Sequence, residues 1–208
     1  TTITTEMEVK RVAESLSYDL NLIFIKPFYD NEKYIDALKK SIDPFIQKEK
    51  FDKLIFSYHG IPKRQAKKTD ITGSHCFSSS DCCETICPGS SDCYRAHTVQ
   101  ASNKVAEKLG LSDSQWEIAY QSRLGPGWLT PFTDKRLAEM PNKDLKSVLV
   151  VCPSFISDCL ETLEEIEIRG RETFFNSGGQ NMTYIPCLND SGDTINLLES
   201  LVLESEIK

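Results

Sequence analysis

Residues 148–167, VLVVCPSFISDCLETLEEIE, indicate the fold class of this chain. The stretch opens with four consecutive aliphatic residues, a pattern typical of a strand that is buried on both faces. Pro153 and Ser154 predict a short turn after this strand, and Ser157 is a suitable N-cap for a following helix. A buried strand, a turn and a helix in this order indicate an α/β unit.

The helix predicted after this turn carries carboxylates on one side. At 100° per residue, Asp158, Glu161 and Glu165 fall within an arc of roughly 60°. The opposite side is apolar and consists of Leu160, Leu163 and Ile166. A solvated acidic face over an apolar one is the ordinary interpretation of such a helix. Because these carboxylates directly follow a buried strand, at the sheet edge where open α/β folds bind ligands, a cation site is the alternative.

The rest of the chain alternates between helical and strand patterns. Helices are predicted at residues 4–15, 31–47, 94–109, 133–139 and 193–203. Further strands are predicted at residues 21–26, 53–58, 116–120 and 182–185. The acidic helix is expected to continue towards residue 175, before Gly178 and Gly179. Strands that alternate with helices predict an α/β fold with a parallel sheet.

Composition excludes several classes of protein. The 208 residues are 39% hydrophobic and 26% charged, with a net charge of −7, as in an ordinary soluble domain and unlike a general nucleic-acid binder. No apolar run reaches the length of a membrane span, and no signal peptide is present. The chain also lacks a G-x-G-x-x-G turn, a P-loop and a G-x-S-x-G elbow. The eight cysteines fit a reducing, cytoplasmic setting better than a short disulfide scaffold.

Three polar stretches follow predicted strands. His59 ends one, residues 120–122 end another, and Asp158 with Glu161 follows a third. The carboxyl ends of parallel strands share one edge, so a single cleft can collect these side chains. A lone histidine after a strand is more often structural than catalytic. Together with carboxylates on the same edge, it suits a reaction that holds a divalent ion and removes protons.

Five cysteines lie between residues 76 and 93 in a segment without clear periodicity: Cys76, Cys82, Cys83, Cys87 and Cys93. This density predicts structural zinc or an iron–sulfur cluster, and the lack of paired C-x-x-C knuckles favours the cluster. Cys82 and Cys83 project in different directions, so only one is expected to be a ligand. The expected ligand set is Cys76, Cys83, Cys87 and Cys93. Disulfides or free thiols are the alternative. A buried, hydrophobic role is predicted for Cys152, Cys159 and Cys187.

Three blocks resemble the signatures of the ferrochelatase family, whose members insert ferrous iron into a porphyrin to make haem. They are LIFSYHGIP at residues 54–62, YQSRLGPGWLTPFTD at 120–134 and CPSFISDCLETLEEI at 152–166. Their order and separation are similar to those of bacterial members, from Thr1 almost to the C-terminus. The resemblance implies a two-lobed chelatase in which each lobe is a Rossmann-like, three-layer parallel sheet with helices on both faces. Residues 1–208 would form the C-terminal lobe, with a cysteine-rich insertion at about residues 66–93 and no N-terminal lobe.

The resemblance also assigns residues to the site. It implies catalytic roles for His59, Glu161 and Asp158, and binding of the ferrous substrate by His59, Glu161 and Glu165. The residues that would border the porphyrin are Tyr58, Ser122 and Trp128. Some members of the family hold a [2Fe–2S] cluster, which strengthens that interpretation of the cysteines. Protoporphyrin IX, the N-terminal lobe and a peripheral membrane contact are the partners that the resemblance implies.

Two other functions remain open at the level of sequence. A chelatase for cobalt or nickel and another tetrapyrrole would share the fold and the pair of His59 and Glu161. A non-catalytic iron–sulfur sensor or tetrapyrrole carrier would keep the lobe without turnover. Retention of both residues weighs against the sensor or carrier, whereas the expected lack of an N-terminal lobe weighs for it.

Overall fold

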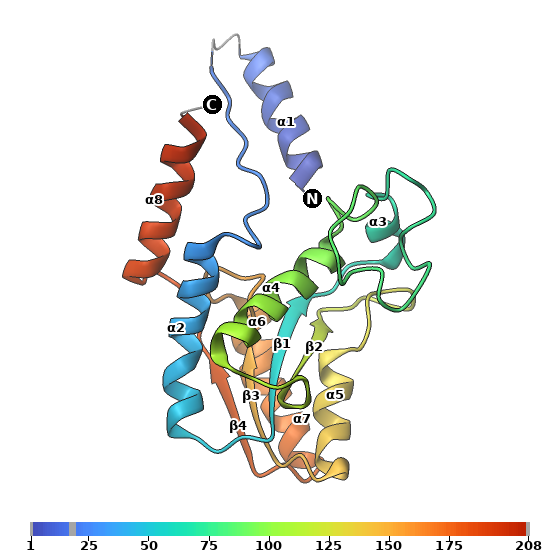
Figure 1. The fold of residues 1–208 in the computed structure, drawn as a ribbon, viewed down its shortest axis with the longest axis vertical. Helices are drawn as coiled ribbons and strands as arrows, with labels where there is room; N and C mark the ends of the chain where they lie inside the picture. Colours follow the sequence, from blue (N-terminus) through green and yellow to red (C-terminus); the bar gives the residue numbers. More distant parts are fainter. Residues whose placement is uncertain (1, 17–19, 207–208) are drawn as a thin grey trace.

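The structure is a computed structural model that describes residues 2–16 and 20–206, and its centre is a parallel β-sheet (Figure 1). The strands are β1 (Lys53–His59), β2 (Trp116–Gln121), β3 (Ser147–Val151) and β4 (Asn181–Ile185). They pair in the order β2-β1-β3-β4, and all three pairings are parallel. The predicted α/β fold with a parallel sheet is therefore confirmed.

Helices connect the strands and flank the sheet. The α-helices are α1 (Thr2–Ser15), α2 (Glu32–Lys48), α3 (Lys63–Lys67), α4 (Tyr94–Leu109), α5 (Thr133–Glu139), α6 (Leu160–Thr162), α7 (Arg171–Asn176) and α8 (Gly192–Glu206). Between them lie the 3₁₀-helices η1 (Asp113–Gln115) and η2 (Met140–Lys143) and the π-helix η3 (Leu163–Gly170). Gly110 ends α4 with a φ of 68°, the left-handed conformation that glycine adopts without a steric penalty. Within the described ranges, no helix is long and apolar enough to cross a membrane.

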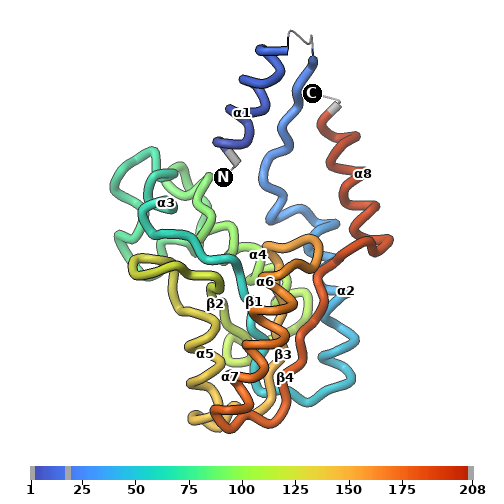
Figure 2. The backbone as a smooth tube through the Cα atoms, turned by 180° about the vertical axis from the view of Figure 1, so that it is seen from behind, coloured from blue at the N-terminus to red at the C-terminus, as the bar shows by residue number. Residues whose placement is uncertain are grey.

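The sheet separates two hydrophobic cores, because successive side chains of a strand point to opposite faces. Leu54 and Phe56 pack with α2, α4 and α8 on one face. Ile55 and Val150 pack with α5, η2, η3 and α7 on the other. Figures 1 and 2 show these two helical layers from opposite sides. The Rossmann-like, three-layer arrangement is thus confirmed.

One predicted strand is wrong. Within the part of the chain that the structure describes, residues 21–26 pair with no strand, and they run beside α1, away from the sheet (Figures 1 and 2). Leu22 and Phe24 are half-buried, and the Lys10 ammonium lies 5.1 Å from the Phe24 ring centroid, whereas Ile23 and Ile25 are exposed. Burial alternates along this segment as it does along a strand, but a β-strand also needs a neighbouring strand for its backbone hydrogen bonds.

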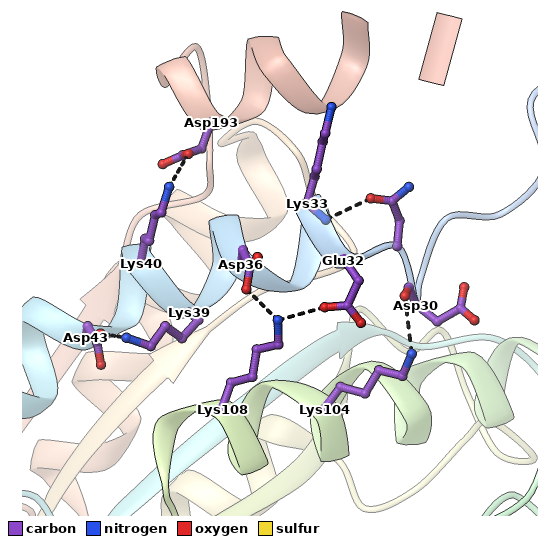
Figure 3. A network of polar contacts seen from close by, with 11 residues as sticks. Asp30, Glu32, Lys33, Asp36, Lys39, Lys40, Asp43, Lys104, Lys108 and Asp193 are labelled. Carbon is purple, nitrogen blue, oxygen red and sulfur yellow. Dashed lines mark hydrogen bonds and ion pairs between the residues drawn. The ribbon is translucent and has the colours of Figure 1, made fainter. Parts of the chain in front are cut away.

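The outer surface of the α2–α4–α8 layer carries a network of ion pairs (Figure 3). The Lys108 ammonium lies 2.7 Å from the Glu32 carboxylate and 2.6 Å from that of Asp36, which ties α4 to α2. Lys40 lies 2.6 Å from Asp193 and ties α2 to α8. These pairs lie on the outside of the helical layer.

Candidate active site

The carboxyl edge of the sheet brings the first two polar stretches together. His59 and Gln121 are register partners at the ends of β1 and β2. The backbone N–H of Gly60 donates to the Gln121 carbonyl oxygen over 2.8 Å, so the two chains stay together beyond the strands. A Cβ atom at Gly60 would lie 2.7 Å from that oxygen, which is closer than a real Cβ contact. Glycine is therefore required immediately after His59.

His59 is held by both of its backbone polar groups. Its N–H donates to Ser154 Oγ over 3.0 Å, and its carbonyl oxygen accepts from Tyr94 Oη over 2.9 Å. Its Nδ1 lies 2.7 Å from the Gly60 carbonyl oxygen. Because a carbonyl only accepts, Nδ1 must carry the proton, and in the neutral ring Nε2 is then left as the acceptor. The half-buried His59 is therefore oriented to take up a proton at Nε2.

Glu161 lies on α6, the first turn of the helical segment that follows β3. A hydrogen bond with the Cys159 thiol lowers the pKa of the Glu161 carboxyl, and the nearby His59 side chain lowers it further. The carboxylate is therefore charged at neutral pH and lies within the electrostatic influence of His59. A charged carboxylate near an imidazole offers one hard oxygen ligand and one nitrogen that can accept a proton.

Asp158 occupies a different environment, just before the helix. Its Oδ1 accepts from Tyr184 Oη over 2.5 Å and from Thr162 Oγ1 over 3.0 Å, and its Oδ2 accepts from Asn189 Nδ2 over 2.8 Å. Burial would raise the pKa of Asp158, but hydrogen bonds from Asn189, Tyr184 and Cys187 together lower it below its ordinary value. Both oxygens thus fasten the turn before α6 to the end of β4.

Glu165 is bound by the residue that follows β2. Its two carboxylate oxygens accept from the backbone N–H of Ser122 over 2.7 Å and from Ser122 Oγ over 2.6 Å. Ser122 adopts a φ of 60°, in the left-handed region that a residue with a side chain rarely occupies. The two residues line a cavity of about 320 Å³. Arg123 and Arg169 also line this cavity.

The helix that carries the carboxylates differs from the prediction in two ways. It begins at Leu160 with Cys159 as N-cap, so the prediction of Ser157 as the cap is wrong. From Leu163 to Gly170 it is a π-helix, in which the spacing of 100° per residue no longer applies. The predicted apolar face is consequently wrong as well, because Leu160 is 72% exposed while Ile166 is buried.

Two residues expected to border the porphyrin lie in contrasting places. Trp128 is half-buried, forms a β-bridge with Pro62 and would contact a Cβ atom at Gly60 at 3.4 Å. Trp128 therefore lies beside the His59 loop. Tyr58 is buried in the core under α4, and its hydroxyl lies 2.8 Å from Ser102 Oγ. The structure thus brings Trp128 to the edge but places the Tyr58 ring inside the fold.

The cysteine-rich segment folds around a small core of its own. The four thiols in this core belong to Cys76, Cys82, Cys83 and Cys93. Burial raises the pKa of Cys76 to about 11, and a hydrogen bond between Cys83 and Cys93 raises the pKa of the first and lowers that of the second. Asp70 organises the segment by accepting from the backbone N–H groups of His75 and Cys76, each over 2.8 Å.

The fifth thiol of the segment has other neighbours. Cys87 Sγ lies 3.6 Å from His75 Nε2, and a hydrogen bond from Ser90 lowers the pKa of Cys87. Three members of the predicted ligand set therefore share one core with Cys82, while Cys87 contacts His75. All eight cysteines are free thiols in the part of the chain described. Across residues 2–16 and 20–206, no three His, Cys, Asp or Glu side chains are placed to hold a metal ion.

Ser57 contributes to the edge although the sequence pattern does not identify it as a site residue, and it binds Gln121 of the predicted polar stretch 120–122. Gln121 is 3% exposed, Ser57 is fully buried, and Ser57 Oγ donates to Gln121 Oε1 over 2.8 Å. The only signal for Ser57 in the sequence is a polar residue within an otherwise apolar strand, in LIFSY. Such a residue is buried only with a hydrogen-bond partner, and the partner cannot be found from one strand alone.

Comparisons with known proteins match one family over nearly the whole chain. The family model described as Ferrochelatase matches residues 1–206. Proteins named ferrochelatase from Pseudomonas fluorescens (strain Pf0-1) and Ectopseudomonas mendocina (strain ymp) are 42% and 43% identical over 203 residues, which is 97% of this chain in each case. A third, from Stutzerimonas stutzeri (strain A1501), is 43% identical over 204 residues. The chain spans 59% of the length of each of these relatives.

Proposed function

The chain belongs to the ferrochelatase family, and on that premise we propose that it takes part in inserting ferrous iron into a porphyrin to form haem. The observation that carries this proposal is the joint placement of His59 and Glu161 at one edge of the sheet, in a chain that matches the family over residues 1–206. The relatives are called ferrochelatases, and the chain contains both residues in blocks that resemble theirs.

The proposed roles follow from the two environments. Insertion of a divalent ion requires removal of two N–H protons from the macrocycle and replacement of water around the ion. His59, with Nε2 left as an acceptor, would take up protons. The charged Glu161 would attract Fe²⁺ and replace one of its waters, because Fe²⁺ accepts carboxylate oxygen together with imidazole nitrogen as ligands. Glu165, bound to Ser122, would extend the acidic track behind Glu161.

The porphyrin would lie over the same edge. Leu124 is 90% exposed in the loop after β2, and Leu160 is exposed next to Glu161. Exposed apolar side chains around polar groups are typical of a surface that binds an apolar ligand. We propose that Ser122 and Trp128 border protoporphyrin IX there. Tyr58 would support this border from within the core, through its bond to Ser102.

We further propose that residues 1–208 are the C-terminal lobe of a two-lobed enzyme. The relatives are longer than this chain, which covers 59% of their length. Large apolar side chains are exposed on α1, on residues 20–25 and on α8, including Ile3, Met7, Ile23, Ile195 and Val202. An N-terminal lobe of the same enzyme is the partner that would cover them and complete the porphyrin cleft.

The cysteine-rich segment, residues 66–93, is the proposed site of a [2Fe–2S] cluster with Cys76, Cys83, Cys87 and Cys93 as ligands. The donors suit such a group by their chemistry, because they are sulfur atoms, mostly buried, and Arg95 donates to Cys82 Sγ over 3.5 Å beside them. In this structure, however, no three of them among the described residues are placed to hold a metal ion. When bound, the cluster would supply one-electron redox chemistry and a crosslink within the segment. Its place would be a reducing compartment such as the cytoplasm, which the eight free thiols support.

The cluster proposal has its own spectroscopic test. Protein purified without oxygen is expected to contain two irons and two sulfides per chain, whereas one zinc without sulfide would support the structural-zinc alternative. Cys87→Ser and Cys82→Ser form a matched pair for the choice of ligand. Loss of the cluster absorption in Cys87→Ser but not in Cys82→Ser supports the proposed set, and the reverse result would replace Cys87 by Cys82.

Iron insertion is the test of the main proposal. The intact protein that contains this chain is assayed without oxygen for ferrous insertion into protoporphyrin, beside its Glu161→Ala variant. Insertion by the parent, reduced at least about 100-fold in Glu161→Ala, is the expected result for loss of an electrostatic group. No insertion by the parent, with Co²⁺ or Ni²⁺ accepted into another tetrapyrrole, would indicate the other chelatase activity. Binding without any insertion would indicate the sensor or carrier.

A further inference from the structure

We infer that Gln121 is a positioning residue that fixes the helical turn bearing Glu161. The inference deepens the proposed function and rests on it for the role of Glu161. Gln121 ends β2, is 3% exposed and lies between the sheet and α6. Its Nε2 donates to the backbone carbonyl oxygen of Glu161 over 2.7 Å. A side chain of the sheet thus supports the backbone of the helix directly at the proposed metal-binding residue.

The orientation of the Gln121 amide is fixed at both ends. The Glu161 carbonyl can only accept, so the NH₂ group of Gln121 must face it. Oε1 then faces Ser57 Oγ at 2.8 Å and Cys152 Sγ at 3.4 Å, both of which can donate. Ser57 has one hydroxyl hydrogen, which goes to Oε1. Thr133 Oγ1, 2.8 Å from Ser57 Oγ, is therefore the donor in that pair.

This chain of donors connects four elements. It runs from Thr133 at the start of α5 through Ser57 in β1 and Gln121 in β2 to Glu161 in α6. The side chains of Thr133, Ser57 and Gln121 belong to residues that are 3% exposed or less. Buried neutral hydrogen bonds of this kind are strongly directional, and leaving one partner unpaired destabilises the fold because water does not replace it. The amide of Gln121 is therefore a rigid support for the carbonyl that it contacts.

The helical turn that Gln121 supports lies at the junction of an α-helix and a π-helix, where a hydrogen bond from another element has a large effect on the backbone. Glu161 lies in the single α-helical turn Leu160–Thr162, immediately before the π-helix that runs from Leu163 to Gly170. A change from α to π geometry shifts the hydrogen-bond register, so neighbouring registers compete at this point. The bond from Gln121 favours one of them. It therefore sets the direction in which the Glu161 side chain leaves the helix.

The next residue acts on the following turn. Ser122 binds the Glu165 carboxylate with its N–H and its hydroxyl. Gln121 differs because it contacts only a backbone atom of Glu161 and leaves the carboxylate available. Its removal should therefore misplace the Glu161 carboxylate without changing its chemistry. A displacement of about 1 Å of a reacting group can cost about 100-fold in rate.

The test uses Gln121→Met in the intact protein, with Gln180→Met as the matched control at an exposed position. Methionine keeps the length of the side chain and removes the hydrogen bonds of the amide to Glu161, Ser57 and Cys152. Gln121→Met is expected to lower kcat for iron insertion by about 10- to 100-fold. The KM for porphyrin should stay within about twofold, because uniform binding is not removed. Gln180→Met should match the parent in both constants.

A double-mutant cycle tests whether Gln121 acts through Glu161. In a Glu161→Gln background, Gln121→Met should change kcat by less than about twofold, because the two residues form one unit. An equal loss in both backgrounds, or no loss in the parent background, would overturn the inference. Ser57→Ala releases the other end of the amide. It is the second variant if Gln121→Met does not fold, and about a threefold loss of kcat is expected for one weakened neutral hydrogen bond.

Hydrogen exchange gives a readout that does not depend on activity. In Gln121→Met the amides of residues 160–170 should exchange at least about tenfold faster than in Gln180→Met, because local opening becomes easier there. Exchange that is unchanged in this segment, or faster throughout the chain, contradicts the positioning role. If the parent protein inserts no iron, the proposed function fails, while the exchange result still decides whether Gln121 fixes this turn.

Discussion

Two polar networks in this protein differ in burial and in charge. At the carboxyl edge of the sheet lies a buried network of hydrogen bonds between the uncharged side chains of Ser57, Gln121 and Thr133. On the α2–α4 surface, ions such as Lys108 and Glu32 pair in solvent (Figure 3). Buried neutral bonds fix geometry because a lost partner is not replaced by water, whereas exposed ion pairs exchange readily with water and salt. The first network therefore suits a site that must hold groups in place.

The difference between the two networks predicts that substitutions at the carboxyl edge of the sheet, and not on the ion-pair surface, affect activity. His59→Ala removes the proton acceptor at Nε2 and should lower iron insertion by at least about 100-fold, as typical for lost acid–base catalysis. Lys104→Ala, on the ion-pair surface, is the control and should retain the parental rate. Both rates are measured in the intact protein without oxygen. A His59→Ala protein with near-parental turnover would remove His59 from the mechanism.

The close approach of two backbones at the edge gives the next largest effect. Gly60→Ala places a Cβ atom 2.7 Å from the Gln121 carbonyl oxygen, so the strand ends must move apart. We expect a loss of up to about 3 kcal/mol in the free energy of unfolding, as for other overpacked positions. Gly125→Ala is the control, because a Cβ atom at Gly125 would have no neighbouring atom within 4 Å. Urea unfolding of both variants measures the difference, and equal stabilities would contradict the close contact.

Much of this edge could be predicted from the sequence because its parts follow strands. The apolar runs of residues 53–58 and 148–151 predict β1 and β3, and a parallel sheet necessarily gathers at one edge the segments that leave the carboxyl ends of its strands. The placement of His59 and Glu161 at one edge is therefore a consequence of the strand pattern alone. Local patterns are sufficient where burial on both faces leaves a continuous hydrophobic signal.

Features that depend on tertiary contacts could not be predicted in the same way. The π-helix from Leu163 to Gly170 has no simple sequence signature, so the orientation predicted for Leu160 is wrong. The strand predicted at residues 21–26 lacks only a partner among the described residues. The hydrogen bonds that Tyr184 and Asn189 donate to Asp158 join segments more than 20 residues apart in the sequence. Each of these features is decided by a neighbour in space rather than by the local pattern.

Asp158 combines features of the two networks, because its charged carboxylate accepts hydrogen bonds from neutral donors inside the fold. Asp158→Asn puts an NH₂ group against either Tyr184 Oη or Asn189 Nδ2, both of which donate in the parent. A loss of about 2 kcal/mol in the free energy of unfolding is expected for hydrogen bonds to a charged group. The control is Asp190→Asn at an exposed position, and chemical unfolding near pH 6 measures both. Equal stabilities would show that the carboxylate is not needed there.

The same variant carries a pH dependence of defined sign. The pKa of Asp158 is lowered in the fold, so the carboxylate stabilises the native state above the ordinary aspartate pKa of about 3.9. This stabilisation is lost as the pH falls through the lower folded pKa. The stability difference between the parent and Asp158→Asn should therefore be full near pH 6 and shrink below about pH 4. A difference that grows on acidification would contradict this assignment.

The smallest effect is expected on the ion-pair surface. Lys108→Ala removes two contacts, to Glu32 and Asp36, yet both acids are at least half exposed and remain hydrated after the change. The loss in the free energy of unfolding should be smaller than that of Asp158→Asn and should decrease between about 0.05 and 1 M salt, because screening weakens exposed pairs. Lys104→Ala is the control, because it shortens a lysine on the same helix that donates to the Asp30 carbonyl oxygen over 3.3 Å. It measures the effect of losing a lysine side chain apart from the effect of losing the two ion pairs. A salt-independent loss in Lys108→Ala as large as that of Asp158→Asn would mean that the outer network, like the buried one, fixes the geometry of the fold.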